Sequence, residues 1–135
     1  MICLDTNIVI AAINLRPVEV RVRLNEDLAA GVQIGIPAIV LFEMYYGAWK
    51  SHRRAKSAAA LRAFLGLAVT LLPFEIEDAR HAGEIRAHLE SRGNPIGYYD
   101  YLIAAQARSR GATLVTSNRR EFERVPGLIV TDWSS

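Results

Sequence analysis

Short strand-like runs alternate with helical stretches along this chain, and that alternation restricts the fold more than any other feature. The strand-like runs cover residues 2–4, 33–36, 69–72 and 113–116, with a fifth candidate at 128–130. Strands separated by helices usually pair in parallel, because the helix carries the chain back across a face of the sheet. The sequence therefore predicts an α/β fold whose central, mainly parallel sheet of four or five strands is flanked by helices.

Helical patterns fill the intervals and end at recognisable stop signals. They are expected at residues 8–13, 17–30, 37–50, 52–65, 76–92 and 98–110, with one short turn at 121–124. Pro17 can open a helix, Gly31 and Gly111 can end one, and Gly93-Asn94-Pro95 forms a turn. The stretches 37–50 and 52–65 follow each other closely enough to form a hairpin. No repeat or linker interrupts the pattern, so residues 1–135 are expected to form a single domain.

Composition excludes several classes of protein. Hydrophobic residues make up 51% of the 135 and charged residues 22%, which is typical of a globular protein rather than a disordered one. No apolar run is long enough to cross a bilayer, and no signal-peptide pattern opens the chain, so the cytoplasm is the expected location. Cys3 is the single cysteine, which excludes an internal disulfide. The net charge of +2 permits a nucleic-acid partner without demanding one.

Three acidic residues stand where the pattern predicts apolar surroundings. Asp5 follows the first strand-like run, Glu43 lies within the apolar stretch 36–44, and Asp100 lies just before the apolar stretch 102–105. A carboxylate in a protein core costs several kcal/mol unless a cation or hydrogen-bond donors receive it. A hard divalent cation such as Mg²⁺ takes oxygen ligands and needs few protein groups, so it is the expected shared receiver.

Each acid also has a structural interpretation. Asp5-Thr6-Asn7 is good helix-start chemistry, and Asp100 would be favourable in the first turn of its helix. Glu43 is harder to explain in this way, because its neighbours are apolar and Gly47, one turn away, leaves room for a close approach. In open α/β sheets, sites form at the carboxyl ends of the strands, where Asp5 and the segment 117–118 would meet. The acids are therefore predicted to converge.

Other polar and basic residues extend the candidate site. Asn118 can hold a metal-bound water or a phosphate and Glu121 can add a carboxylate, although both also suit a helix start. The basic run 50–56 can hold a phosphate backbone, and tyrosines flank the acids. Most of these tyrosines are expected in the core, with one or two stacking on bases: Tyr45, Tyr46, Tyr98 and Tyr99. The candidate RNA contacts are Thr6, Asn7, Arg53, Arg54, Arg119 and Arg120.

Carboxylates that hold Mg²⁺ are suited to phosphodiester hydrolysis. The ion lowers the pKa of a bound water and neutralises charge on the attacked and leaving oxygens. In this scheme Asp5 and Asp100 bind the metal directly. Glu43 binds it directly or through water and orients the attacking water. In-line attack would leave a 5′-phosphate and a 3′-hydroxyl.

Several blocks of sequence resemble the PIN-domain family. They are Leu4-Asp5-Thr6-Asn7, Phe42-Glu43 with Gly47, and Gly97-Tyr98-Tyr99-Asp100, in that order and spacing. The tail, with residues 114–122 followed by Val125-Pro126-Gly127 and Asp132-Trp133, resembles the VapC toxin branch of that family. The resemblance covers essentially the whole chain.

The resemblance implies a PIN-like fold and an endoribonuclease that depends on Mg²⁺, with Mn²⁺ able to substitute. It implies the toxin of a type II toxin–antitoxin pair that cuts structured RNA, tRNA above all. Its partners would be a second copy of the chain, in a homodimer, and a cognate antitoxin. The family's acids carry onto Asp5, Glu43 and Asp100 as catalytic and metal-binding residues. Asn118 stands where many PIN domains have aspartate, and Glu121 is the nearest candidate to replace it.

Two other functions compete with this hypothesis. A non-catalytic RNA- or partner-binding module with a degenerate PIN site is favoured by Asn118 in place of an acid. A metal-dependent nuclease acting on DNA is the other, although the chain is short for the extra elements such enzymes carry. Saturable Mn²⁺ binding that is lost in Asp100→Asn would count against the binding module.

Overall fold

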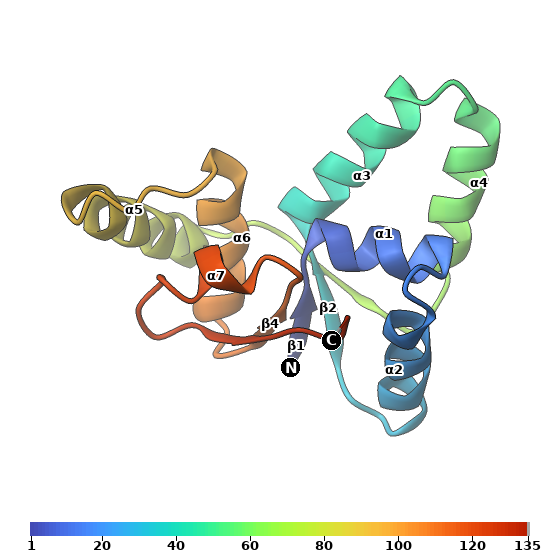
Figure 1. Ribbon diagram of the computed structural model, residues 1–135, viewed down its shortest axis with the longest axis horizontal. Coiled ribbons are helices and arrows are strands. Elements are labelled where there is room, and N and C mark those ends of the chain that lie inside the picture. The colour runs from blue at the N-terminus through green and yellow to red at the C-terminus, as the bar shows by residue number, and fades with distance from the viewer. Residues whose placement is uncertain (135) are drawn as a thin grey trace.

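A five-stranded parallel sheet forms the centre of the computed structural model, which describes residues 1–134 (Figure 1). The strand order is β3-β2-β1-β4-β5, and all four neighbouring pairs run parallel. The predicted α/β fold is confirmed, with every strand parallel rather than most of them. The strands are β1 (Ile2–Leu4), β2 (Ile34–Pro37), β3 (Thr70–Leu72), β4 (Thr113–Val115) and β5 (Ile129–Thr131).

Seven helices in the described residues connect and cover the strands. Figure 1 shows α5, α6 and α7 on one side of the central strands and α1 to α4 on the other. The bounds are α1 (Thr6–Asn14), α2 (Val18–Ala29), α3 (Ala38–Lys50), α4 (Arg54–Leu65), α5 (Ile76–Ser91), α6 (Tyr98–Arg108) and α7 (Arg119–Phe122). Most bounds lie within two residues of those expected. The short helix predicted at 121–124 begins earlier, at Arg119, so that Phe122 is fully buried.

Strand β1 occupies the middle of the sheet and the middle of the core. Its residues Cys3 and Leu4 have no solvent exposure, because β2 and β4 pair with its two edges and core residues of the helices cover its side chains. The chain moves from β1 to β2 on one side and later returns to β4 on the other side. A parallel sheet with connections that diverge in this way has a crevice at the carboxyl end of the strand between them. Residue 5 lies at that point.

The hairpin of α3 and α4 stands away from the sheet, as Figure 1 shows. Val40 is the only residue of α3 that is fully buried, and Phe42 is 48% exposed. The expectation that Glu43 lies in a buried apolar segment holds in part: Leu41 and Met44 pack partly buried against the core, whereas Phe42 is exposed and Glu43 itself is partly exposed. The expectation that most of the tyrosines at 45, 46, 98 and 99 pack in the core is wrong, because each is at least half exposed. No helix within residues 1–134 is both long and apolar enough to cross a membrane.

Candidate functional site

Asp5 lies at the junction of β1 and α1 and is only 5% exposed. Its Oδ1 accepts a hydrogen bond of 2.7 Å from the backbone N–H of Thr6, so it caps α1. Its Oδ2 accepts a second bond of 2.7 Å from Oγ1 of Thr116, the residue that follows β4. Burial raises the pKa of the Asp5 carboxyl above its ordinary value, and these two bonds act in the opposite direction. The helix-cap interpretation and the site interpretation are therefore compatible.

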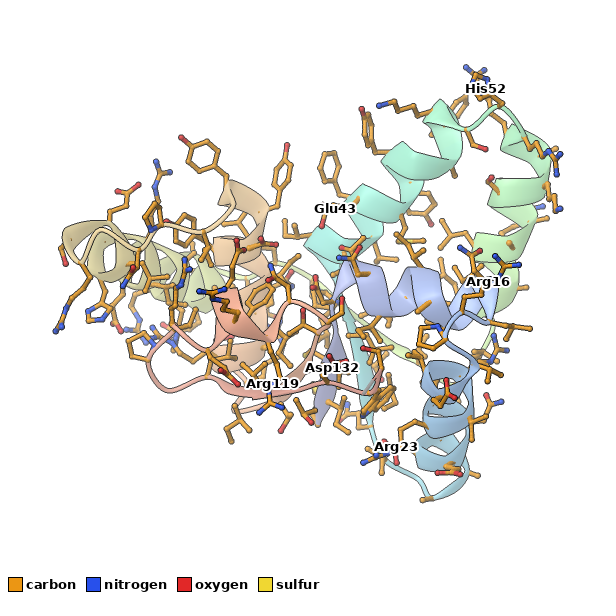
Figure 2. The ribbon with its side chains drawn as sticks, in the orientation of Figure 1. Arg16, Arg23, Glu43, His52, Arg119 and Asp132 are labelled. Atoms are coloured by element: carbon orange, nitrogen blue, oxygen red, sulfur yellow. The ribbon has the colours of Figure 1, made fainter. Side chains whose placement is uncertain are left out.

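Glu43 reaches the same region from α3. Its Oε1 accepts a hydrogen bond of 2.7 Å from Oγ1 of Thr6, so Thr6 contacts two of the predicted acids, one through its amide and one through its hydroxyl. Glu43 is partly exposed. Figure 2 shows it on the half of α3 nearer the sheet, with His52 at the outer tip of the hairpin. The structure thus brings Asp5 and Glu43 together through one threonine.

Asp100 lies in the first turn of α6 and completes the set of three predicted acids. Burial raises the pKa of its carboxyl to about 7, and repulsion from Asp5, Glu121 and Glu43 adds to the shift. The preceding Gly97 makes room for it, because a Cβ at that position would lie 3.0 Å from Oδ2 of Asp100. Four carboxylates therefore act on one another at the carboxyl end of the sheet.

Glu121 is the fourth of these carboxylates, and Asn118 holds it in place. Nδ2 of Asn118 donates a hydrogen bond of 2.8 Å to Oε2 of Glu121, while the Asn118 backbone N–H donates one of 2.9 Å to Oγ1 of Thr116. Of the two candidates for the fourth site position, Glu121 supplies the negative charge and Asn118 orients it.

The donors of this site suit a hard divalent cation, because all of them are carboxylate or hydroxyl oxygens. Burial and the neighbouring carboxylates both disfavour the charged form of Asp100 and so raise its pKa, and a bound cation would offset both effects. Within residues 1–134, however, no three carboxylate, imidazole or thiol side chains are arranged closely enough to enclose a metal ion. The donor chemistry fits the implied ion.

The basic residues predicted to contact RNA are spread over several places. A groove of about 450 Å³ extends from Glu43 past Gly47 to Arg53 and Lys56 at the tip of the hairpin. Arg54 is directed elsewhere: its Nε donates to the Trp49 carbonyl (2.7 Å), and it lines a separate groove between α3 and α4. The other candidates are Asn7, Arg119 and Arg120, which are all exposed. Nε of Arg119 donates to the Glu123 carboxylate at 2.8 Å.

Thr116, whose hydroxyl orients Asp5, was not among the site residues predicted from the sequence. A signal was present, because Thr116 follows β4 directly, as Asp5 follows β1, and parallel neighbours end at the same edge. Thr116 is one of the four buried polar side chains within residues 1–134. The others are Asp5, Asp78 and Gln106.

Comparison with known proteins decides the family. The sequence pattern described as "PIN domain" matches residues 2–128 of this chain. The chain belongs to the PIN-domain family. PIN-domain nucleases are in general metal-dependent. The predicted resemblance is confirmed, and so is the PIN-like fold.

Relatives place this PIN domain in the VapC branch. It is 44% identical over 131 residues to the tRNA(fMet)-specific endonuclease VapC of Shigella flexneri, covering 97% of this chain and 96% of that protein. It is 43% identical to Ribonuclease VapC2 of Haemophilus influenzae, covering 96% of each. Among solved structures, VapBC2 from Rickettsia felis bound to a promoter DNA fragment superposes with a TM-score of 0.91 at 40% identity, over 98% of this chain and 99% of that one. DNA-bound VapBC from Salmonella typhimurium gives 0.89 at 39% identity, over 98% and 97%.

Proposed function

We propose that this VapC-type ribonuclease toxin hydrolyses phosphodiester bonds in tRNA, in the cytoplasm, with Mg²⁺ or Mn²⁺ as its cofactor. The observation that carries the proposal is the convergence of four carboxylates at the carboxyl end of β1, where burial, and then repulsion from the other three, raise the pKa of Asp100 to about 7. The Shigella flexneri relative is a tRNA(fMet)-specific endonuclease, which supports tRNA as the substrate class. The relatives' 40–44% identity over nearly the whole chain supports the toxin role.

Each side chain has a role in this proposal. Asp5 and Asp100 would hold a divalent cation, and Glu121 would add negative charge beside them. When bound, the ion would lower the pKa of a water and neutralise charge on the scissile phosphate. Glu43 keeps Oε2 available to accept a proton from the attacking water, because its Oε1 is already bonded to Thr6. In-line attack then leaves a 5′-phosphate and a 3′-hydroxyl.

The hairpin of α3 and α4 is the proposed path for the RNA backbone. Residues 44–74 contain no aspartate or glutamate, whereas Lys50, Arg53, Arg54, Lys56 and Arg62 all lie within them. Arg53 and Lys56 line the groove that begins at Glu43. Cations along a groove that ends at the acids would hold phosphates on one side of the bond to be cut.

Two protein partners belong to the proposal. The Rickettsia felis and Salmonella typhimurium relatives were solved as VapBC complexes, which supports a cognate antitoxin for this chain. A homodimer is the second proposed assembly. Exposed aromatic side chains of α3 and α6, among them Phe42, Tyr46, Tyr98 and Tyr99, offer apolar surface of the kind that interfaces cover.

The deciding experiment is induced expression of the wild type and of Asp5→Ala in growing cells, with mapping of new RNA ends. Growth arrest with discrete 5′-phosphate ends in tRNA, absent from the variant at equal protein level, is expected. Purified protein should lose the same cleavage in EDTA and regain it with Mg²⁺. Arrest by both proteins without new ends would reject the catalytic proposal.

A non-catalytic binding module is the second candidate. The separation of the carboxylates and the presence of Asn118 at the fourth position favour it. In this case a basic segment of a partner, rather than a metal, would balance the acids. Calorimetric titration with Mn²⁺ distinguishes the two: saturable binding in the wild type that disappears in Asp100→Asn supports the enzyme, and no binding supports the module.

A further inference from the structure

Gln106 is a fully buried amide in α6 that the proposed chemistry does not use. A buried amide is costly unless both its oxygen and its nitrogen find partners. Within residues 1–134 no buried side-chain nitrogen or oxygen lacks a hydrogen-bond partner, so the partners of Gln106 account for its presence in the core.

Those partners belong to two other elements. Nε2 of Gln106 donates to the carbonyl oxygens of Leu72 (3.0 Å) and Pro73 (3.2 Å), at the end of β3. Oε1 accepts from the backbone N–H of Ile39, in the first turn of α3 (3.3 Å). The orientation of the amide is fixed by its surroundings, because carbonyl oxygens can only accept and the Ile39 N–H can only donate.

The hydrogen bond from Ile39 to Gln106 satisfies a backbone N–H at the start of α3. The first four N–H groups of a helix have no partner within the helix. The N-cap residue of α3 is Pro37, which provides no side-chain hydrogen bond. Gln106 provides one from a different helix. Pro37 also pairs with Leu72 across β2 and β3, so Gln106 holds the beginning of α3 and the strand beside it together.

This bond lies between the two helices that carry opposing acids. Glu43 is one helical turn beyond Ile39 on α3, and Asp100 is on the first turn of α6. The carboxylates of Glu43 and Asp100 repel each other. Two other contacts oppose that repulsion, the ring pair of Phe42 on α3 and Tyr99 on α6 (5.3 Å) and the Thr6–Glu43 hydrogen bond (2.7 Å). Both act through side chains of α3, whereas Gln106 bonds to the backbone of α3.

We propose that Gln106 is a positioning residue for the acidic site: it holds α3 against α6 so that Glu43 and Asp100 can face the same cation. This inference rests on the proposed function, since it concerns the metal-binding geometry of that site. Gln106 itself touches neither substrate nor metal. Residues that orient metal ligands typically change metal affinity by 10- to 100-fold when they are replaced.

The test replaces Gln106 by Met, which keeps the length of the side chain and removes both hydrogen-bonding groups. Ser109→Ala is the matched control. It removes a hydroxyl that donates to Asp78, at the other end of α6, and leaves α3 untouched. Both variants are expected to be folded and less stable than the wild type. Only Gln106→Met should bind Mn²⁺ about 10-fold more weakly in calorimetry.

Kinetics and geometry give two further readouts. For tRNA cleavage, Gln106→Met should lower kcat with KM nearly unchanged, and high Mg²⁺ should restore most of the loss. Nitroxide labels at Lys50→Cys on α3 and Tyr98→Cys on α6, in a Cys3→Ala background, should show a longer or broader separation in Gln106→Met. Wild-type Mn²⁺ affinity together with an unchanged distance distribution would overturn the proposal.

A measurement on the wild type keeps the proposal testable if the variant does not fold. The Ile39 amide should exchange with deuterium more slowly than the Ala38 amide, and equal rates would show that the Gln106 bond is not held in solution. If the wild type binds no Mn²⁺, the proposed metal site fails. Label distances and amide exchange then still report whether Gln106 joins α3 to α6, but its link to the site is overturned.

Discussion

Asp5 uses its two carboxylate oxygens differently, and that division explains how a helix cap can also serve a catalytic site. Oδ1 accepts from the amide of Thr6, while Oδ2 accepts from the hydroxyl of Thr116 across the sheet. A carboxylate held by two donors cannot swing toward solvent, even though burial disfavours its charge. Local helix chemistry therefore orients the residue that the site needs.

The raised pKa of Asp100 predicts that the metal-free protein loses stability as the pH rises. The carboxyl has a pKa of about 7 when folded and an ordinary value of 3.8, so its contribution to stability is fully present below pH 3.8 and is lost as the pH rises through 7. Asp100→Asn should therefore raise the free energy of unfolding in EDTA at pH 8 by about 1 kcal/mol, after allowance for partial exposure.

Urea unfolding at pH 8 and at pH 4 measures this effect, and at pH 4 the gain should nearly disappear. Adding Mg²⁺ at pH 8 should stabilise the wild type and leave Asp100→Asn unchanged. An equal gain at both pH values would mean that the substitution acts through packing instead of charge.

Gly97→Ala should disturb the site while sparing the fold. The backbone of Gly97 is at φ −60°, which alanine adopts easily, but the added Cβ would lie 3.0 Å from Oδ2 of Asp100. The carboxylate would have to move by a few tenths of an ångström, and Mn²⁺ affinity should fall about 10-fold. Calorimetry measures the affinity. Gly83→Ala in α5, where nothing lies within 4 Å of the new Cβ, is the control and should bind Mn²⁺ normally.

At the scale of single residues, the sequence predicts the acids better than their partners. Asp5, Glu43 and Asp100 stand out because carboxylates are unusual beside apolar runs. Thr116 and Gln106 do not stand out, because threonine and glutamine occur in any environment and their role depends on contacts 33 to 111 residues away in the chain. Glu121 is predicted from the sequence as the nearest candidate for the fourth acid, but its hydrogen bond from Asn118 is seen only in the structure.

Among the elements, the hairpin of α3 and α4 departs most from its sequence-based prediction. An apolar helix pattern predicts burial, yet the aromatic residues of α3 are exposed, with Trp49 at 69%. Apolar surface that meets a partner has the same sequence pattern as apolar surface that meets the core. The two can be distinguished only when the position of the helix relative to the sheet is known.

The groove along this hairpin predicts a measurable salt dependence. In an inactive Asp5→Ala background, the double variant Arg53→Ala/Lys56→Ala should bind tRNA more weakly. The slope of log Kd against log salt concentration should fall by about 1 for each phosphate contact that is lost. Arg80→Ala/Arg92→Ala, with the same change of charge on and after α5, is the control. If both pairs give the same slope, the hairpin has no special role in RNA binding.

At the scale of the whole molecule, the alternation of strands and helices in the sequence predicts the parallel sheet directly. The order of the strands does not follow from that pattern, because the same alternation is compatible with several orders. In the structure the most apolar strand, β1, lies between β2 and β4, and β5 lies outside β4. The site lies at that branching point, so its position becomes certain only with the order.

The C-terminal segment should contribute measurably to the stability of the whole fold. Trp133 is 6% exposed, belongs to the main core, and has the Arg23 guanidinium of α2 over its ring at 5.8 Å (Figure 2 labels Arg23). Trp133→Ala should lower the free energy of unfolding by about 3 kcal/mol, because it leaves a large cavity. Urea unfolding measures this loss. Mn²⁺ affinity of the folded variant should stay near that of the wild type, and a change below 1 kcal/mol would contradict the prediction.

The central position of β1 determines which parts of the site can form while the chain is being synthesised. Asp5 and Glu43 are synthesised early, but β4, which closes the second edge of β1, and the acids Asp100 and Glu121 come from the last third of the chain. A growing chain on the ribosome therefore holds half of the acidic site and an unfinished sheet. A chain that stops before Asp100 lacks two of the four acids and the strand β4, so we expect such fragments to be inactive as nucleases.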